Sequence, residues 1–250
     1  KAGNMEVRRI KNWRIQPQKD GVVQCTFVGG PLLEGSWKAQ RMRISAGSLQ
    51  ATVQGDSSKA YSLVKGTMSG EVTVVVERGE ASRTRTLTLK AGTATYTAGD
   101  QKVLAEGGVT VNSEDPAADQ TLHATGSSGT LHLSPPGGQT ALESAVLSGP
   151  VTMKLVSSRV VEEGGKSRRV PYTVNGSGNR LEYDAKARTI ALIGKVVISG
   201  DDPVFGADVE AAKATITLTA AGEIESVDFE GDPTGRTSFS SKNLGGGATR

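Results

Sequence analysis

Short segments in which apolar and polar residues alternate occupy most of the chain, with polar turns between them. Residues 84–89 and 215–218 alternate with a period of two, which is typical of strands with one buried and one solvated face. No segment places apolar residues at helical spacing over three turns, although residues 204–214 come closest. The pattern predicts an all-β fold of antiparallel hairpins with little or no helix.

Clusters of turn-forming residues mark the hairpin loops that this pattern predicts. They lie at residues 19–21, 78–80, 98–100, 127–129, 135–138, 184–186, 200–202 and 220–222. A hairpin centred on Ser127 and Ser128 would pair His123 directly with His132 on one face, opposite the face that carries Leu122, Leu131 and Leu133. Two such histidines could begin a zinc site, but a third ligand at a recognisable spacing is missing, so no metal is expected.

A unit of glycine, one variable residue and valine recurs along the chain. It occurs at residues 70–72, 107–109, 149–151 and 194–196, with a weaker copy, Gly-Asp-Pro, at 231–233. The glycines of the four strong copies are 37, 42 and 45 residues apart by subtraction of their numbers. Repeats of this length indicate stacked hairpins that bury their apolar faces against one another. Glycine suits a strand entrance that bends sharply or that another backbone approaches closely.

The residues that follow each unit alternate so that one apolar set shares a face. The candidate lining of an apolar groove is Val72, Val74, Val109, Val111, Val151, Met153, Leu192, Val196, Ile198 and Phe229. Only 4% of the chain is aromatic against 36% hydrophobic, so few bulky rings are available to fill such an interior. Each lipid methylene buried there would contribute about 0.8 kcal/mol. The alternative is that these side chains form an ordinary filled core.

One stretch carries a family resemblance. Residues 181–198, LEYDAKARTIALIGKVVI, combine a Tyr-Asp turn at Tyr183 with an alternating strand and the Gly194 unit, and Tyr96 with the Gly107 unit repeats that order. This resembles the OstA-like family, to which the lipopolysaccharide-transport proteins LptA and LptC and the N-terminal domain of LptD belong. The resemblance covers residues 45–235, and the Asn usual between Gly and Val is replaced in every copy. Residues 1–44 resemble an LptC-type opening, and residues 240–250 are expected to be a disordered tail.

The resemblance implies an elongated β-jellyroll, folded like a taco, whose groove holds acyl chains. It implies a periplasmic protein, with a signal or membrane anchor that this chain lacks, that passes lipopolysaccharide or a related amphipathic glycolipid toward the outer membrane. Open sheet edges predict pairing with other OstA-like domains, including head-to-tail self-assembly. The alternatives are a β-solenoid scaffold with a filled core that docks partner proteins and, less favoured, a carbohydrate-active β domain.

Composition and charge exclude several other functions. A net charge of +3 permits an anionic partner, but no nucleic-acid signature is present. Cys25 is the single cysteine, so no internal disulfide is expected, and it has no recognisable His or Asn partner for catalysis. We therefore expect that the chain is not an enzyme and that it binds no cofactor. Basic clusters at residues 8–14, 41–43 and 166–169 could contact an anionic lipid head or a membrane surface, or could be ordinary solvated charges.

Overall fold

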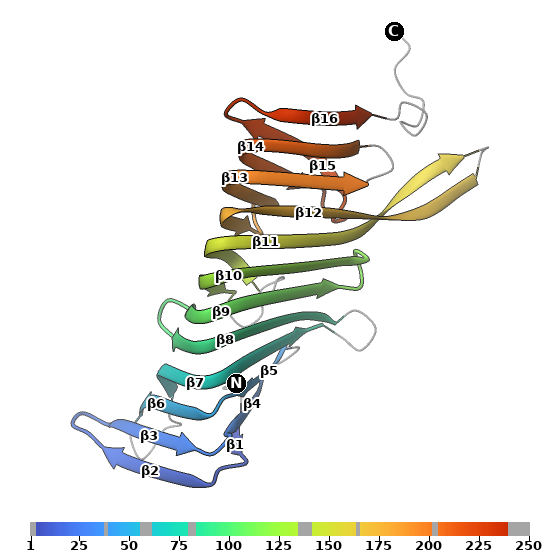
Figure 1. The fold of residues 1–250 in the computed structure, drawn as a ribbon. Helices are drawn as coiled ribbons and strands as arrows, with labels where there is room; N and C mark the ends of the chain where they lie inside the picture. Colours follow the sequence, from blue (N-terminus) through green and yellow to red (C-terminus); the bar gives the residue numbers. More distant parts are fainter. Residues whose placement is uncertain are drawn as a thin grey trace.

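A single antiparallel β-sheet forms the described part of the chain. The computed structural model describes residues 4–37, 40–55, 62–79, 84–134, 142–163, 166–201 and 205–239. Within these ranges it contains sixteen strands in one open antiparallel sheet and no helix (Figure 1). The predicted all-β, elongated jellyroll of stacked antiparallel hairpins is confirmed. Residues 205–214 of the segment with weak helical character lie within a strand, and the expected tail at 240–250 lies outside the described residues.

The strands differ greatly in length. They are β1 (Asn4–Arg8), β2 (Asn12–Pro17), β3 (Val22–Val28), β4 (Leu32–Trp37), β5 (Gln40–Ser45), β6 (Ser48–Gln54), β7 (Ser62–Arg78), β8 (Arg85–Thr97), β9 (Lys102–Asp115), β10 (Gln120–Leu133), β11 (Leu142–Glu163), β12 (Lys166–Asp184), β13 (Thr189–Asp201), β14 (Phe205–Leu218), β15 (Ile224–Glu230) and β16 (Thr234–Phe239). Strand β5 spans the boundary expected at residue 44, so the N-terminal strands extend the same sheet. The outer part of the β11–β12 hairpin projects from the stack (Figure 1).

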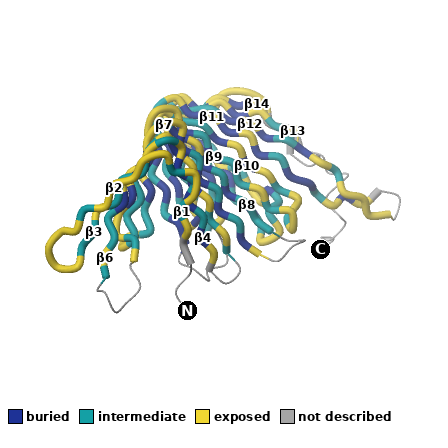
Figure 2. The backbone as a smooth tube through the Cα atoms, turned by 90° about the horizontal axis from the view of Figure 1, so that it is seen from below, coloured by how far each residue is buried: buried dark blue, intermediate teal, exposed yellow. Residues whose placement is uncertain are grey.

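The long strands are bent, and the bends divide the sheet into two arms. The first half of β7 pairs with β6 and the second half pairs with β5. We call the side that contains β2, β3, β6 and β15 the β6 arm, and the side that contains β1, β4, β5 and β16 the β5 arm. Each of the strands β7 to β14 contributes one half to each arm. Seen along the stack, the arms diverge from a common bend (Figure 2).

The Gly-x-Val units form this bend. Each of the four strong units lies inside one long strand, β7, β9, β11 or β13, and not at a strand entrance as predicted; strand pairing shifts register at these positions. Gly194 and Lys195 both have positive φ, 77° and 52°. At Gly107 (φ 82°) the neighbouring strand passes so closely that a Cβ would lie 3.2 Å from the Cα of Gly92. The weaker copy at 231–233 separates β15 from β16, which both pair with β14. The glycines of these units therefore let β7, β9, β11 and β13 turn from one arm into the other.

Most of the predicted turns that the structure describes are present, and one prediction is wrong. Asp184 closes the β12–β13 turn, because its Oδ1 accepts hydrogen bonds of 2.8 Å from the backbone N–H groups of Lys186 and Ala187. Residues 127–129, in contrast, lie within β10, where a bulge between Gly126 and Ser128 replaces the expected hairpin. The polar residues here have the composition of a hairpin turn, but they form part of the bend between the two arms. Residues 135–138 lie outside the described residues, as do residue 80 of the turn predicted at 78–80 and residue 202 of the turn predicted at 200–202.

Candidate functional site

Each arm presents one continuous apolar row to the interior, with one residue from each strand. Neighbours in a row are directly paired across strands, so the rows follow from the registers. The row of the β6 arm is Trp13, Phe27, Leu49, Met68, Ala94, Ala105, Gly129, Leu147, Leu181, Leu192, Ala214 and Phe229. The row of the β5 arm is Val7, Leu33, Ile44, Val74, Leu89, Val111, Ala124, Met153, Gly176, Ile198, Val209 and Gly235. At a strand spacing of about 4.8 Å, each row is roughly 50 Å long and carries no charge.

The predicted groove residues all face this interior. Val74, Val111, Met153 and Ile198 lie in the row of the β5 arm, and Leu192 and Phe229 lie in the row of the β6 arm. Val72, Val109, Val151 and Val196 follow the corner glycines and lie where the arms meet. Nine of the ten side chains are buried, with exposures of 0–6%, and Phe229 is partly buried against the same core. Period-two alternation after each corner was a sufficient signal to find them.

The two arms pack against each other over much of their length. Gly176 of the β5 arm leaves the space that Leu192 of the β6 arm occupies, because a Cβ at Gly176 would collide with Cδ1 of Leu192. Within the β6 arm, a Cβ at Gly129 would lie 2.8 Å from Cδ2 of its paired neighbour Leu147, and it would lie 3.3 Å from Cγ1 of Val109 at the bend. Small residues therefore accept large ones, as in a close-packed core. In this conformation the protein's own side chains fill most of the space that the sequence suggested for a ligand.

An apolar cavity remains at the N-terminal end of the interior. It has a volume of about 110 Å³ and lies between Val7, Leu33 and Ile44 of the β5 arm and a larger set from the β6 arm: Cys25, Phe27, Leu49, Ala51, Val53, Leu63, Gly66, Met68 and Tyr96. Burial raises the pKa of the Cys25 thiol. Burial also raises the pKa of the Tyr96 phenol, and its 3.2 Å hydrogen bond to Oε1 of Gln101 opposes that shift. The cavity is thus nearly free of polar groups.

A second, smaller cavity lies near the middle of the stack. It measures about 40 Å³ between Leu122 and Ala124 on one arm and Leu147, Leu181 and Tyr183 on the other. Burial raises the pKa of Tyr183. Pockets that hold small molecules usually measure about 300–1,000 Å³. Neither cavity reaches that size, so a large ligand could enter only if the arms separated.

Hydrogen bonds join the free ends of the two arms at the β14–β15 turn. The β14–β15 turn of the β6 arm crosses to the β5 arm, where Nε2 of Gln120 donates to the carbonyl of Gly222 (2.9 Å) and Nη2 of Arg159 donates to the carbonyl of Ile224 (2.6 Å). The N–H of Ile224 in turn donates to the hydroxyl of Tyr172 (3.1 Å), which is only 1% exposed. We call residues 219–224 together with Gln120, Ser157, Arg159 and Tyr172 the seam latch.

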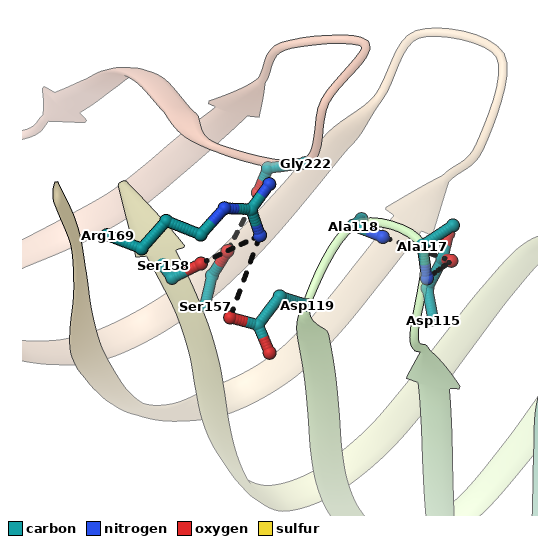
Figure 3. Close-up of polar contacts among 8 residues, drawn as sticks. All are labelled: Asp115, Ala117, Ala118, Asp119, Ser157, Ser158, Arg169 and Gly222. Atoms are coloured by element: carbon teal, nitrogen blue, oxygen red, sulfur yellow. Dashed lines mark hydrogen bonds and ion pairs between the residues drawn. The ribbon is translucent and has the colours of Figure 1, made fainter. Parts of the chain in front are cut away.

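The latch sits beside a polar cluster at the base of the projecting hairpin (Figure 3). Oγ of Ser157 donates to the Gly222 carbonyl at 3.4 Å. Arg169 reaches Oγ of Ser158 at 3.4 Å and the carboxylate of Asp119 at 3.8 Å. The Arg169–Asp119 pair is solvent-exposed and therefore contributes little, at most about 1 kcal/mol. No local sequence pattern indicated the latch, because its partners are backbone groups and polar residues distant in sequence.

A second link between the arms lies at the end of β7. Nη2 of Arg78, on the β5 arm, donates to the carbonyl of Ser134 on the β6 arm at 2.8 Å. Both residues are buried, with exposures of 6% and 5%. Burial lowers the pKa of the Arg78 guanidinium, and the Glu143 carboxylate opposes that shift. Because a buried charge without a partner is unfavourable, Arg78 stabilises the closed arrangement of the arms only while its hydrogen bond to Ser134 is kept.

The predicted histidine pair does not exist. His123 and His132 lie on the same strand, β10, with His123 between Asn112 and Lys154 and His132 between Lys102 and Ser144. Nδ1 of His123 contacts Oδ1 of Asn112 at 2.5 Å. The prediction depended on the hairpin that the corner bulge replaces. Among the described residues, no group of His, Cys, Asp and Glu side chains could hold a metal ion.

The basic clusters are partly neutralised. Arg8 pairs with Glu6 at 2.7 Å and with Glu34 at 3.6 Å, and Arg43 pairs with Glu34 at 3.3 Å.

In the part of the chain that the structure describes, no helix has the length and apolar character required to cross a membrane. Comparison of the chain with family models, with curated proteins and with solved structures finds no match.

Proposed function

We propose that the chain is a non-enzymatic glycolipid carrier of the OstA-like type, which holds acyl chains of lipopolysaccharide or a related amphipathic glycolipid between its arms. The observation that carries this proposal is the pair of uncharged apolar rows that face each other from one end of the sheet to the other. A filled globular core would need no such continuity along one axis. The charged and sugar-bearing head would remain in water beside the strand ends.

Binding would proceed by separation of the arms. Apolar contacts between the arms would be exchanged for apolar contacts with hydrocarbon, so the area removed from water changes little and the net cost stays small. The N-terminal cavity of about 110 Å³ is the natural starting point, since hydrocarbon can occupy it without displacing a packed side chain. The seam latch would set the resistance to opening farther along the stack.

Transfer would occur between sheets joined at their edges. Within the described residues, β1 pairs only with β4, β2 only with β3, and β15 and β16 only with β14. Both arms therefore have an unpaired edge at each end. Unpaired edges accept further strands. We propose that another OstA-like domain pairs with the edges formed by β15 and β16 and extends both rows, in a periplasmic chain that leads toward the outer membrane.

The experiment uses a substitution that fills the N-terminal cavity without damaging the fold. Gly66 lines this cavity, and a Cβ there would have Leu49 Cδ1, at 3.9 Å, as its nearest neighbour. Gly66→Val should therefore fold normally, whereas its added carbons occupy the space that an acyl chain would use. We expect the wild-type chain to bind a fluorescent apolar probe that a lipid A-type glycolipid displaces. Gly66→Val should weaken both probe and glycolipid binding about tenfold, and Gly66→Ala should weaken them less.

A second candidate is a β-solenoid scaffold with a filled core that docks partner proteins. The close fit of Leu192 against Gly176 favours it, because that contact leaves no space between the arms. The same experiment separates the two candidates. If the folded wild-type chain binds no amphiphile, and Gly66→Val changes only stability, the scaffold function stands and the carrier function fails.

A further inference from the structure

Positive charge is concentrated at one end of the stack. Residues 1–54 contain nine Lys and Arg and three Asp and Glu, a net charge of +6. The whole chain has 29 basic and 26 acidic residues, so residues 55–250 contain 20 and 23, a net charge of −3. Strands β1 to β6 form the N-terminal end of the sheet (Figure 1). The molecule therefore has a basic end and a weakly acidic remainder along its long axis.

The same end exposes large apolar side chains. Trp13 and Ile15, on the edge strand β2, are 65% and 50% exposed. They pair across the strand with Phe27 and Cys25, which line the N-terminal cavity, and so share the face that points into the interior. Trp13 is the first residue of the apolar row of the β6 arm. The interior surface thus continues without interruption onto an exposed edge.

Three exposed basic residues surround this edge. Arg9 and Lys11 lie in or beside the β1–β2 connection, and Arg14 lies between Trp13 and Ile15 with its side chain on the opposite face of the strand. In the described parts of the chain, none of the three forms an ion pair with a carboxylate, whereas Arg8 and Arg43 do. Their charges therefore remain available to an external anion.

We propose that this end of the molecule, from Arg9 to Pro17, docks onto the surface of an anionic lipid bilayer. Trp13 would lie at the level of the head groups, where indole rings partition preferentially, and Ile15 would enter the acyl boundary beside it. Arg9, Lys11 and Arg14 would lie close to the lipid phosphates, and each contributes about a fivefold gain in partition to an anionic surface. Charge complementarity favours a bilayer over a second copy of this chain. In a second copy, the net charge of −3 on residues 55–250 is spread over a much larger surface, so its negative charge density is lower than that of an anionic bilayer.

Docking would place the apolar row in contact with the membrane from which acyl chains come. The delivery of acyl chains from the membrane to the apolar row rests on the proposed carrier function. Docking itself does not rest on it, because docking involves only the exposed edge at β2. Gly66→Val keeps the edge intact and blocks the cavity. A chain that docks on vesicles with this substitution but binds no glycolipid separates the two proposals.

The test is co-sedimentation of the full chain with intact vesicles. We expect binding to vesicles that contain phosphatidylglycerol, weak binding to phosphatidylcholine alone, and loss of binding at high salt. The double variant Trp13→Ser, Ile15→Ser should lower partition more than about tenfold, and so should the triple variant Arg9→Gln, Lys11→Gln, Arg14→Gln. Leu104→Ser and Val197→Ser, at exposed apolar positions farther along the stack, should bind like the wild type, and circular dichroism should show all variants folded.

Several outcomes would overturn the proposal. The proposal is contradicted if the wild-type chain stays in the supernatant in the presence of anionic vesicles. It is also contradicted if Leu104→Ser loses as much vesicle binding as the Trp13→Ser, Ile15→Ser variant. If the Trp13→Ser, Ile15→Ser variant abolishes self-association in light scattering but leaves vesicle binding intact, the edge is a contact between copies of the chain and not a membrane surface.

Discussion

The side-chain amide of Gln120 and the carbonyl oxygen of Gly222 form a 2.9 Å hydrogen bond between residues 102 positions apart. Gln120 begins β10 on the β5 arm, and Gly222 lies in the β14–β15 turn of the β6 arm. Their contact therefore joins the free ends of the two arms on the open side of the sheet, opposite the bends. In the proposed carrier, the arms could separate at this end of the stack only if this contact opened.

A disulfide across the latch should prevent loading. A Cβ on Gly222 would lie 3.1 Å from Cβ of Ala118, slightly below the separation in disulfides, so a small movement of the turn allows the bond. In a Cys25→Ser background, oxidised Ala118→Cys, Gly222→Cys should bind glycolipid at least about tenfold more slowly, and reduction should restore the rate.

The single-cysteine variants are the controls for this lock. Gly222 has φ of 83°, so replacing it costs about 1–2 kcal/mol by itself, and the Gly222→Cys single variant measures that cost. Equal loading of the oxidised and reduced double variant would show that the arms do not part at the latch.

Removal of the Tyr172 hydroxyl should loosen the latch. Tyr172→Phe leaves the buried N–H of Ile224 without this acceptor, which should lower the unfolding free energy by about 1–3 kcal/mol in urea titrations and accelerate probe entry. Thr125→Val is the control, because it also removes a hydroxyl, and that hydroxyl bonds to Thr152 within one arm and outside both cavities. A faster entry rate in Thr125→Val than in Tyr172→Phe would argue against a role for the latch.

The glycine bends should be intolerant of a side chain. Gly107→Ala combines a positive φ of 82° with backbone contact to Gly92 at 3.2 Å, and we expect a loss of about 2–4 kcal/mol in unfolding free energy. Gly99→Ala, in an open turn with nothing within 4 Å, should change it by less than about 1 kcal/mol. Similar effects at both positions would mean that the bend does not require glycine.

Cys25 is a native reporter of the N-terminal cavity. Burial raises its pKa, so at pH 8 a smaller fraction is thiolate than in a free thiol, and reaction with a disulfide reagent should be slower than for an exposed cysteine. The rate should rise as the pH is raised further. Bound glycolipid should slow it again, because Cys25 lines the cavity. A rate that glycolipid leaves unchanged would place the ligand elsewhere.

The sequence predicted the strands and the inward faces but not the closure of the interior. Period-two alternation identified Val109 and Ile198 because a strand's two faces are distinguished by burial alone. The same polar and glycine-rich composition serves a hairpin turn and a bend inside a strand, so residues 127–129 were assigned to the wrong one. Contacts such as Gln120 with Gly222 or Leu192 with Gly176 depend on how the two arms meet, which no local pattern records.

The central claim is that hydrocarbon lies between the two arms. The most direct measurement is photocrosslinking with a glycolipid whose acyl chain carries a diazirine, followed by mass-spectrometric mapping of the labelled residues. We predict labels on Phe27, Leu49 and Met68 of one arm and on Leu33 and Ile44 of the other. Labels confined to outward-facing residues such as Leu104 and Val197, or no labels on a folded chain, would contradict the account.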